Sequence, residues 1–591
     1  MPAKRNTQTR RRRVPKKGVR RSSNKNLAAN TVLVLFSLCV LGILIAGSYL
    51  YFKKYAPTRE HLALTDYYRY LHDDEAAVII NDTYAEPEED ATIGYAIVQD
   101  GLVYLERHIL KEQIDDRYVF DDTEQIMRYA TDKSLVSVPY EGSSYSIGTE
   151  TQEEGFPIII SAYDHIFVAA DFANQFSDFS YSLAEEPYRV TIYTAGFTRE
   201  VASLRRKTAI RKLGGPKSKI LKDVRRGDTV SVIQNHGSWS NVATEDGVIG
   251  YVQSRTLTKS SETTVARSLP QPEYTHKTLD QRIVLSWNMV TNSIANKGVN
   301  ALLDASDGLN VICPTWFYIN DNSGGIFDIS SADYVKTCHK RNIQVWGLVS
   351  DIENRDVDVT TVLYRTSYRD RLIDNLIHAA ISCGMDGINV DFEHVPAEAA
   401  DGYLEFIREL SLRCKENDLF LSIDDYVPAS FNLYYNRAEQ AYYADYIILM
   451  AYDEHYSGDD EAGSNASLPF VKEGIESTLL EVPNSQLICG MPFYCREWLD
   501  TNGELSSNNI AMRDVADYLT KHSLTAEWDE ELGQNYVEYT DGSTKHMLWI
   551  EDAQSLSRKL TLMKDYELAG SAFWRLGHEP ESIWTVIKEY E

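Results

Sequence analysis

The stretch DGINVDFE, residues 386–393, decides the fold of the C-terminal half of this chain of 591 residues. Its apolar residues at positions 388, 390 and 392 alternate with Asn389, Asp391 and Glu393, as in a strand whose successive side chains point to opposite faces. Inward residues rise roughly 6–7 Å apart along such a strand, so Glu393 is predicted at the open end of a sheet with Asp391 one step beneath it. Burying unpaired carboxylates is costly, and the stack is therefore typical of a catalytic site.

Apolar runs of strand length recur on both sides of this stretch, and amphipathic segments such as residues 369–383 and 399–417 lie between several of them. The alternation predicts a parallel sheet, and eight such units predict an α/β fold of the (β/α)8 TIM-barrel type over residues 280–591. The chemistry of such barrels lies at the C-terminal ends of the strands. The eight predicted strands are 283–290, 309–319, 343–350, 387–393, 419–428, 444–455, 486–498 and 570–577.

Four motifs, in order along these strands, are similar to those of family 18 glycoside hydrolases. Residues 386–393 resemble the DxxDxDxE signature, MAYD at 450–453 resembles the MxYD of the sixth strand, and GMPFY at 490–494 resembles the G-x-P-x-Y of the seventh. Trp574 resembles the floor tryptophan of the eighth strand. The sequences around these motifs look closer to bacterial spore-cortex and wall-lytic members than to chitinases.

The resemblance implies a retaining hydrolysis in which the substrate supplies the nucleophile, an exception to the scheme of two protein carboxylates. Glu393 would protonate the leaving oxygen while the 2-acetamido oxygen of the sugar attacks the anomeric carbon. Asp391 would orient the acetamide, and Tyr452 would hydrogen-bond its oxygen. The resemblance implies no metal and no organic cofactor. It implies substrate-binding roles for Asp386, Asn389, Asp453, Tyr494 and Trp574.

One position departs from the signature, because Asn389 stands where the family has its second aspartate. An amide cannot share a proton with its neighbour, so a simpler proton shuttle is predicted. The resemblance implies a polysaccharide substrate, peptidoglycan cleaved after N-acetylglucosamine. Two alternatives stay open: a chitinase-type enzyme acting on another acetamido glycan, and a catalytically inactive glycan-binding or scaffold protein. The intact Glu393, Asp391 and Tyr452 argue against an inactive protein.

The first 26 residues carry eleven lysines and arginines and no acid, whereas the whole chain has a net charge of −28. Such an acidic body is repelled by phosphates, so the basic tail does not indicate a nucleic-acid partner. Residues 27–52 contain no charged side chain and are long enough to cross a hydrocarbon core of about 30 Å.

A cleaved signal peptide is the competing interpretation of residues 27–52. Its apolar region would span about 7–15 residues, which is shorter than this run, so a retained transmembrane helix is predicted. The positive-inside rule then places the N-terminus in the cytoplasm and residues 55–591 outside the cell membrane, in a single-pass topology.

Between the predicted helix and the barrel the sequence indicates a short stalk and two modules. Residues 55–75 are the stalk, and residues 76–195 resemble the α+β module at the N-terminus of copper amine oxidases, here without a histidine cluster for copper. Residues 207–258 resemble a bacterial SH3-like domain, which either holds cell-wall peptides or serves as a spacer. Residues 259–279 are a polar linker with two prolines.

Seven cysteines are scattered along the chain without metal-ligand spacing. Most lie in or beside apolar runs, which indicates buried free thiols. One disulfide, joining Cys489 to Cys495 or Cys313, stays open from the sequence alone.

Overall fold

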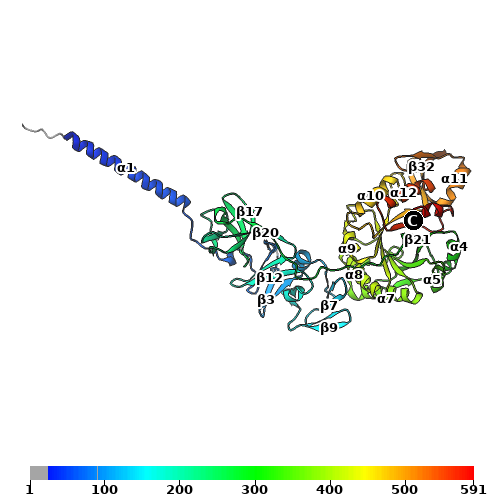
Figure 1. Ribbon diagram of the computed structural model, residues 1–591, viewed down its shortest axis with the longest axis horizontal. Coiled ribbons are helices and arrows are strands. Elements are labelled where there is room, and N and C mark those ends of the chain that lie inside the picture. Colours follow the sequence, from blue (N-terminus) through cyan, green and yellow to red (C-terminus); the bar gives the residue numbers. More distant parts are fainter. Residues whose placement is uncertain (1–23, 90, 591) are drawn as a thin grey trace, which may run out of the picture.

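Figure 1 shows the computed structural model of the chain, which describes residues 24–89 and 91–590. A long helix is followed in space by a small sheet, then by an α+β module, and finally by a large barrel. The order in space differs from the order in sequence, because the small sheet is built from residues 198–264, after the α+β module. The predicted basic tail at 1–26 lies outside the described residues except for its last three.

Helix α1 (Asn24–Tyr55) contains the predicted membrane segment at 27–52. Its stretch Ala29–Tyr55 has a mean hydropathy of 2.5, and none of it is buried against the rest of the molecule. By length and composition alone, this helix can cross a membrane. It ends in Lys53 and Lys54, whose positive charges suit the negative end of the helix dipole.

The small sheet has seven strands in the order β16-β15-β19-β18-β17-β14-β20, all of them antiparallel. Strands β14 and β20 lie outside the predicted bounds of 207–258. They extend the sheet, because β14 pairs with β17 and β20 pairs with β14. The strand bounds are β14 (Thr198–Ser203), β15 (Thr208–Arg211), β16 (Ile220–Val224), β17 (Thr229–Asn235), β18 (Trp239–Ala243), β19 (Ile249–Gln253) and β20 (Ser261–Thr264).

The predicted stalk at 55–75 is not free, because it lies along the small sheet. His61 forms a parallel bridge with Ile220 of β16, and the Tyr68 hydroxyl donates to the Gly247 carbonyl oxygen at 2.6 Å. The nearby side chains of Leu62 and Leu64 pack against the apolar core of the sheet. The small sheet is therefore fixed next to the end of α1, as Figure 1 shows.

The α+β module consists of three antiparallel or mixed sheets around one apolar core. The sheet orders are β12-β13-β1-β2, β10-β11-β4-β3 and β5-β6-β7-β8-β9. The bounds are β1 (Ala77–Ile80), β2 (Thr83–Ala85), β3 (Ala96–Gln99), β4 (Leu102–Glu106), α2 (Arg107–Ile109), β5 (Tyr118–Asp121), β6 (Ile126–Ala130), β7 (Leu135–Pro139), β8 (Ser144–Ile147), β9 (Glu150–Glu153), β10 (Ile159–Ala162), β11 (His165–Ala169), α3 (Ala170–Ala173), β12 (Phe179–Ala184) and β13 (Arg189–Thr194).

The barrel confirms the predicted fold class, since eight parallel strands close when β21 pairs with both β22 and β34. The order around it is β21-β22-β24-β25-β26-β27-β28-β34, and the short β23 adds to β22 in antiparallel. The strand bounds are β21 (Ile283–Asn288), β22 (Val311–Ile319), β23 (Ile326–Asp328), β24 (Gln344–Ser350), β25 (Gly387–Asp391), β26 (Phe420–Tyr426), β27 (Tyr446–Met450), β28 (Leu487–Pro492) and β34 (Gly570–Trp574).

Two apolar layers hold the barrel together, one between strands and helices and one inside the strands. The outer layer takes Ile388, Val390 and Phe392, as the alternation in residues 386–393 predicts. The inner layer includes Trp287 and Trp346. The covering helices are α4 (Val299–Asp304), α5 (Ala332–His339), α6 (Val359–Tyr364), α7 (Thr366–Cys383), α8 (Ala400–Glu416), α9 (Arg437–Tyr443), α10 (Leu468–Thr478), α12 (Ala553–Asp565) and α13 (Ile583–Lys588).

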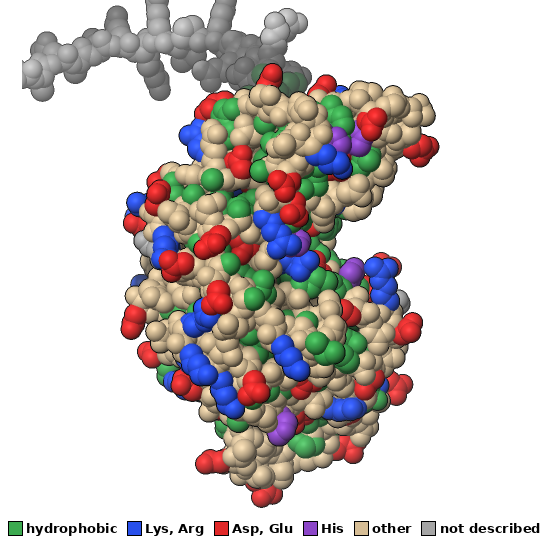
Figure 2. Space-filling view, turned by 90° about the vertical axis from the view of Figure 1, so that its right-hand side faces the viewer, with side chains coloured by type: hydrophobic (Ala, Val, Ile, Leu, Met, Phe, Trp, Pro, Cys, Tyr) green, Lys and Arg blue, Asp and Glu red, His purple; other side chains and the backbone are tan. Residues whose placement is uncertain are grey.

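The strand predicted at 486–498 is in fact two strands of different sheets. The pairing of β28 with β34 of the barrel ends at Pro492. The Phe493 N–H then donates to the Trp574 carbonyl oxygen at 2.6 Å. The next strand belongs to an antiparallel sheet inserted before α12, and Figure 2 shows the surface hollowed below the lobe that carries β32 and α11 in Figure 1. The insertion comprises β29 (Tyr494–Thr501), β30 (Glu504–Ala511), α11 (Val515–His522), β31 (Glu527–Asp529), β32 (Gln534–Asp541) and β33 (Thr544–Ile550).

The α+β module is docked on the outer helices of the barrel through a buried ion-pair cluster. Arg128 of β6 donates to Glu409 of α8 at 2.8 Å and to Asp370 of α7 at 2.7 Å. Arg369 of α7 donates to the same Glu409 at 2.7 and 2.8 Å. The predicted linker also touches both parts, since the Tyr274 hydroxyl lies 3.4 Å from the Arg117 guanidinium of the α+β module and 3.4 Å from the Tyr443 hydroxyl of α9. All seven cysteines are free thiols, so neither proposed disulfide exists in the structure.

Candidate active site

Glu393 lies at the open end of the barrel, two residues after β25 ends, as predicted. Its carboxylate accepts a hydrogen bond of 2.5 Å from the Tyr426 hydroxyl at the end of β26. Burial raises the pKa of Glu393, and the charges of Asp453 and Glu353 act in the same direction, against the lowering effects of Tyr426 and His394. A raised pKa is what a general acid needs at neutral pH.

The backbone that carries Glu393 is held by Asp351, which follows β24. Its carboxylate accepts from the Glu393 N–H at 2.8 Å and from the His394 N–H at 3.0 Å. Burial raises the pKa of Asp351 to about 6, although these two backbone donors oppose the shift. Asp351 therefore fixes the backbone of the turn that follows β25 and carries Glu393.

Asp391 lies one inward step beneath Glu393 and is 8% exposed. Its Oδ1 is buried and has no hydrogen-bond partner among the described residues. Burial raises the pKa of Asp391 well above its usual value, and the charges of Glu393 and Asp424 add to the rise. A buried acceptor without a donor is costly, so this oxygen is available for a donor on a ligand.

Asn389 lies deeper still and is completely buried. Its amide donates to Asp424 at 2.8 Å and to the Ser422 hydroxyl at 3.0 Å. The Trp287 indole N–H donates to Asn389 at 3.2 Å and to Asp424 at 3.0 Å. The structure therefore pairs both the oxygen and the nitrogen of the Asn389 amide with protein atoms and leaves none of this side chain exposed in the mouth.

Asp453 and Tyr494, which the family motifs point to, lie together on the opposite side of the mouth. The Tyr494 hydroxyl donates to Asp453 at 2.6 Å, and the Arg496 guanidinium donates to the same oxygen at 2.8 Å. Asp453 adopts a left-handed backbone conformation with a φ of 57°, which is uncommon outside glycine and recurs at functional sites. Its carboxylate is thus held in one orientation at the rim.

Three aromatic rings form the floor of the mouth. The Trp287 ring lies 6.0 Å from the Trp574 ring and 6.4 Å from the Tyr452 ring, both in edge-to-face arrangements. Trp574 ends β34, and Tyr452 follows β27 by two residues. The floor therefore offers an apolar face to a sugar ring, with the Tyr452 hydroxyl beside the acids.

Asp386 does not join this group, although the sequence assigned it to substrate binding. It precedes β25, at the N-terminal end of the strand, whereas the mouth lies at the C-terminal end. Its carboxylate accepts from the Val345 N–H and lies 2.8 Å from the His339 ring nitrogen. Asp386 thus ties the start of β25 to β24 and to α5, at the end of the barrel away from the mouth.

Sequence reasoning missed several residues that the structure adds to the mouth. Asp424 and Tyr426 share the inward parity of β26, so the period-2 rule that found Asp391 would have found them too. Asp351 could have been found as the first residue after β24. Arg496 carries no such signal, because it lies in a strand of the inserted sheet.

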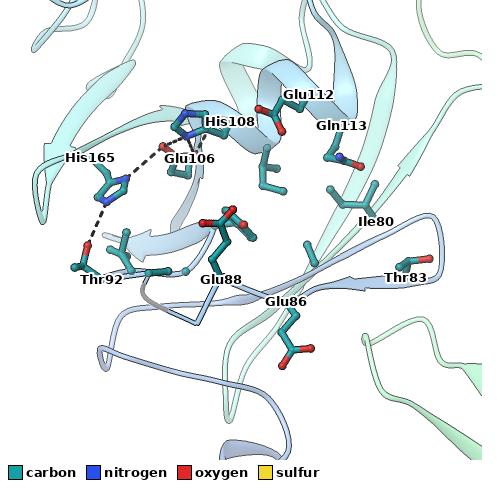
Figure 3. Close-up of a pocket in the computed structure, with 16 residues that line it drawn as sticks. Ile80, Thr83, Glu86, Glu88, Thr92, Glu106, His108, Glu112, Gln113 and His165 are labelled. Carbon is teal, nitrogen blue, oxygen red and sulfur yellow. Dashed lines mark hydrogen bonds and ion pairs between the residues drawn. The ribbon is translucent and has the colours of Figure 1, made fainter.

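A hollow of about 420 Å³ adjoins the Glu393 turn and is lined by Asp351, Arg355 and His394, among others. A separate cavity of about 730 Å³ lies in the α+β module (Figure 3). Its lining includes buried Glu106, which lies 3.0 Å from the His108 ring and 3.5 Å from the His165 ring. This second cavity shares no lining residue with the barrel mouth.

The fold and the mouth define the class. A stack of carboxyl groups at the C-terminal ends of the strands of a (β/α)8 barrel, over an aromatic floor, is the arrangement of a barrel-type glycoside hydrolase. Residues 286–579 match the family described as Glycosyl hydrolases family 18. The chain is a glycoside hydrolase, and these residues form its family 18 domain.

Two curated relatives of this chain match about half of it or less. The "Uncharacterized glycosylase YvbX" of Bacillus subtilis (strain 168) is 26% identical over 304 residues, which are 49% of this chain and 87% of that protein. The "Cortical fragment-lytic enzyme" of the same organism is 23% identical over 262 residues, 42% of this chain and 60% of that protein. The chain thus spans less than two thirds of that relative.

Solved structures similar to this chain match slightly more than half of it. The crystal structure of the Bacillus cereus spore cortex-lytic enzyme SleL has a TM-score of 0.48 and 19% identity, over 56% of this chain and 77% of that one. A chitinase from Chromobacterium violaceum ATCC 12472 has a TM-score of 0.47 and 21% identity, over 52% of this chain and 99% of that one.

Proposed function

We propose that the chain hydrolyses a glycan containing N-acetylglucosamine by substrate-assisted catalysis with retention of configuration. The observation that carries this proposal is the buried Oδ1 of Asp391, which lacks a hydrogen-bond donor among the described residues and lies beside the acid Glu393. The N–H of a 2-acetamido group is a donor of the right kind for that oxygen. A sugar with a 2-hydroxyl has no amide to place there, and no nucleophile to offer.

The proposed reaction begins when Glu393 gives its proton to the glycosidic oxygen. The bond from that oxygen to the anomeric carbon breaks, and the acetamido oxygen forms a new bond to the same carbon, which gives an oxazolinium. Asp391 accepts the acetamido N–H and balances the positive charge, while the Tyr452 hydroxyl donates to the acetamido oxygen. Glu393 then takes a proton from water, and the hydroxide opens the oxazolinium with overall retention.

Asp453, Tyr494 and Trp574 hold the sugar at the cleavage point in this proposal. Asp453 is fixed by Tyr494 and Arg496 and is exposed enough to accept from a sugar hydroxyl. Trp574 offers an apolar face to the sugar ring. No step needs a second carboxylate as a nucleophile.

Peptidoglycan is the proposed substrate, cleaved after N-acetylglucosamine. The proposal is supported by the motifs and by the similarity to a protein named for lysis of cortical fragments. A chitinase-type specificity is the second candidate, since chitinases also appear among the similar proteins. Both polymers carry the acetamido group that the Asp391 pocket accepts.

The proposed location is the outer face of the cell membrane, with α1 as a single-pass anchor and the N-terminus in the cytoplasm. The length and hydropathy of Ala29–Tyr55 and the basic residues before it support this orientation. Protease treatment of intact protoplasts should remove a tag at the C-terminus and spare a tag at the N-terminus. Protection of both tags would contradict the proposed orientation.

The reaction is tested with the full chain purified in detergent and incubated with purified peptidoglycan and, separately, with chitin oligomers. Mass spectrometry should detect muropeptides that end in reducing N-acetylglucosamine. Glu393→Gln should release none, and Glu473→Gln, which changes an exposed acid of α10, should match the native protein. Products from chitin alone would move the substrate to the second candidate, and none from either would favour an inactive glycan-binding protein.

Dependence on the acetamido group is tested by N-deacetylated peptidoglycan and by a thiazoline analogue of the oxazolinium. The deacetylated polymer should not be cut, and the thiazoline should inhibit competitively. Equal cleavage of acetylated and deacetylated polymer would contradict substrate assistance while leaving the hydrolase intact.

A further inference from the structure

The position that departs from the family signature is filled by a hydrogen-bonded pair rather than by a single side chain. Asn389 on β25 and Asp424 on β26 are both fully buried, and the Asn389 amide donates to Asp424 at 2.8 Å. The two strands pair in parallel with Asn389 opposite Ser422, so Asp424 is the next inward residue above that level. It therefore lies at the level of Asp391, one inward step above Asn389.

We propose that Asp424 supplies the second buried carboxyl of the active site, on the strand next to the one where the DxxDxDxE signature has it, and that it acts through Asp391. This inference rests on the proposed function. Asp424 is a positioning residue in this scheme, because it exchanges no atom with the substrate.

The hydrogen bonds divide the charge between the two aspartates. Both oxygens of Asp424 accept from fixed N–H donors, one from Asn389 at 2.8 Å and one from Trp287 at 3.0 Å. Donors of this kind favour the ionised carboxylate. Asp391 has no such donor at its buried Oδ1, and an unsatisfied acceptor of this kind favours the protonated acid.

Burial raises the pKa of Asp424 as well, but the hydrogen bonds from Asn389 and Trp287 lower it. Of the two aspartates, Asp424 therefore holds the negative charge, and that charge keeps a proton on the pair formed by Asp391 and Glu393. Burial, then the charge of Glu393, then that of Asp424 raise the pKa of Asp391. When Glu393 gives the shared proton to the glycosidic oxygen, Asp391 is left as the carboxylate that faces the oxazolinium. The second aspartate of the signature would exert the same effect from position 389.

A purely structural role explains Asp424 less well. A buried carboxylate costs more than an apolar side chain of similar volume, so a residue needed only for packing would not carry a charge. Among the described residues, no lysine or arginine is paired with Asp424. Its neighbour on the same strand, Asp425, faces the other way and lies 3.9 Å from Arg437.

The arrangement also permits an exchange of the two side chains. The Trp287 N–H lies between the Asn389 and Asp424 oxygens and donates to both. Asn389→Asp combined with Asp424→Asn would keep the amide-to-carboxylate bond and the indole donor, and would move the charge from β26 to β25. The exchanged pair therefore provides a matched variant.

The test compares the pH dependence of kcat for the full chain in detergent, with 4-methylumbelliferyl N,N′-diacetylchitobioside as the probe. Asp424→Asn should move the basic limb to lower pH by about one unit and lower kcat about tenfold above it, with little change in KM. Asn389→Asp alone adds a second carboxyl and should move the limb to higher pH. The exchanged variant should recover the native limb and most of the native kcat.

Two results would overturn the role of Asp424. One is a folded Asp424→Asn protein with the native limb and the native kcat. The other is an exchanged variant that folds, by thermal unfolding, and stays as impaired as Asp424→Asn. If Asp424→Asn alone does not fold, the exchanged variant decides. A native protein that cleaves no acetamido glycan, with Glu393→Gln as its control, would instead remove the proposed function itself.

Discussion

The barrel buries charge at its mouth and on its outer helices, and these two places are built differently. At the mouth, Asp391, Glu393 and Asp424 lie close together, and among the described residues none of them is paired with a lysine or arginine. On the outer helices, Glu409 accepts from two arginines at 2.7 to 2.8 Å. As a result, the pKa of Asp391 at the mouth is raised, and the pKa of Glu409 on the outer helices is lowered.

The contrast separates a site built for chemistry from one built for docking. Burial and like charges raise the pKa of Asp391, whereas Arg369 and Arg128 hold the pKa of Glu409 below its ordinary value in spite of burial. A buried acid without hydrogen-bond donors destabilises the fold, and a substrate that supplies a donor removes this cost when it binds. A fully paired acid fixes two modules to each other. Changes at the mouth should therefore alter activity, and changes at the docking cluster should alter stability.

The largest expected effect is the loss of activity in Glu393→Gln. Removing the general acid should lower kcat by about 10²–10⁴-fold without lowering the melting temperature. Glycan release by mass spectrometry and thermal unfolding of the same samples measure the two quantities. If Glu393→Gln lowers the melting temperature together with kcat, the claim that changes at the mouth alter activity and not stability is contradicted.

The next effect is a loss of stability in Glu409→Ala, which leaves Arg369 buried without a counter-charge. Breaking a buried pair in this way costs about 3–5 kcal/mol of unfolding free energy. The native stabilisation is present above the ordinary pKa of glutamate, about 4.3, and is lost as the pH falls through the lower folded pKa. The kcat of the folded fraction should stay at the native value.

Arg413→Ala is the matched control for Glu409→Ala, since Arg413 lies on the same helix and pairs with the exposed Asp374. It should cost no more than about 1 kcal/mol. Urea unfolding of the full chain in detergent gives both values. Equal costs for the two variants would show that burial of the cluster contributes nothing.

A smaller effect is expected for Tyr426→Phe, which removes the hydroxyl that donates to Glu393. Because that hydrogen bond lowers the pKa of Glu393, its loss should move the basic limb of kcat/KM to higher pH, with a change of a few-fold in kcat. Tyr456→Phe, at an exposed tyrosine after β27, should leave the limb in place. A limb that moves to lower pH would contradict the assignment of Glu393 as the acid.

The smallest effect is a gain in stability for Asp391→Asn. An acid whose folded pKa is raised costs stability above its unfolded pKa of about 3.9, and the cost disappears below it. The variant should therefore melt a few degrees higher than the native protein at pH 7 and at the same temperature below pH 4. A lower melting temperature at pH 7 would show that Asp391, like Glu409 of the docking cluster, stabilises the fold.

The sequence predicted the mouth better than the docking cluster because the two depend on different distances along the chain. Alternation within residues 386–393 places Asp391 and Glu393 inside the barrel from a local rule alone. The same alternation along β26 places Asp424 and Tyr426 inward, but no signature motif points to that strand. Arg128 and Glu409 are 281 positions apart, so no local sequence pattern predicts that these two side chains are in contact.

Two differences between the sequence expectation and the structure have physical reasons of the same kind. The signature places Asp386 with the catalytic acids, but a strand of five residues separates it from the mouth. The apolar run 486–498 continues without a break in the sequence, yet β28 ends at Pro492. The Phe493 ring packs with its centroid 4.6 Å from that of Phe573 of β34, and Tyr494 begins the inserted sheet. Strand ends depend on what the chain packs against, which a single run of residues does not record.

The seam between the N-terminal segment and the small sheet gives the molecule a mechanical order. The Leu62 N–H donates to the Ile220 carbonyl oxygen at 2.8 Å, and the Ile220 N–H donates back to Glu60 at 2.9 Å. Tension applied along α1 reaches these bonds before it reaches the α+β module or the barrel. The segment at 55–75 would thus separate from the small sheet first and lengthen the tether, while the catalytic barrel behind it stays folded.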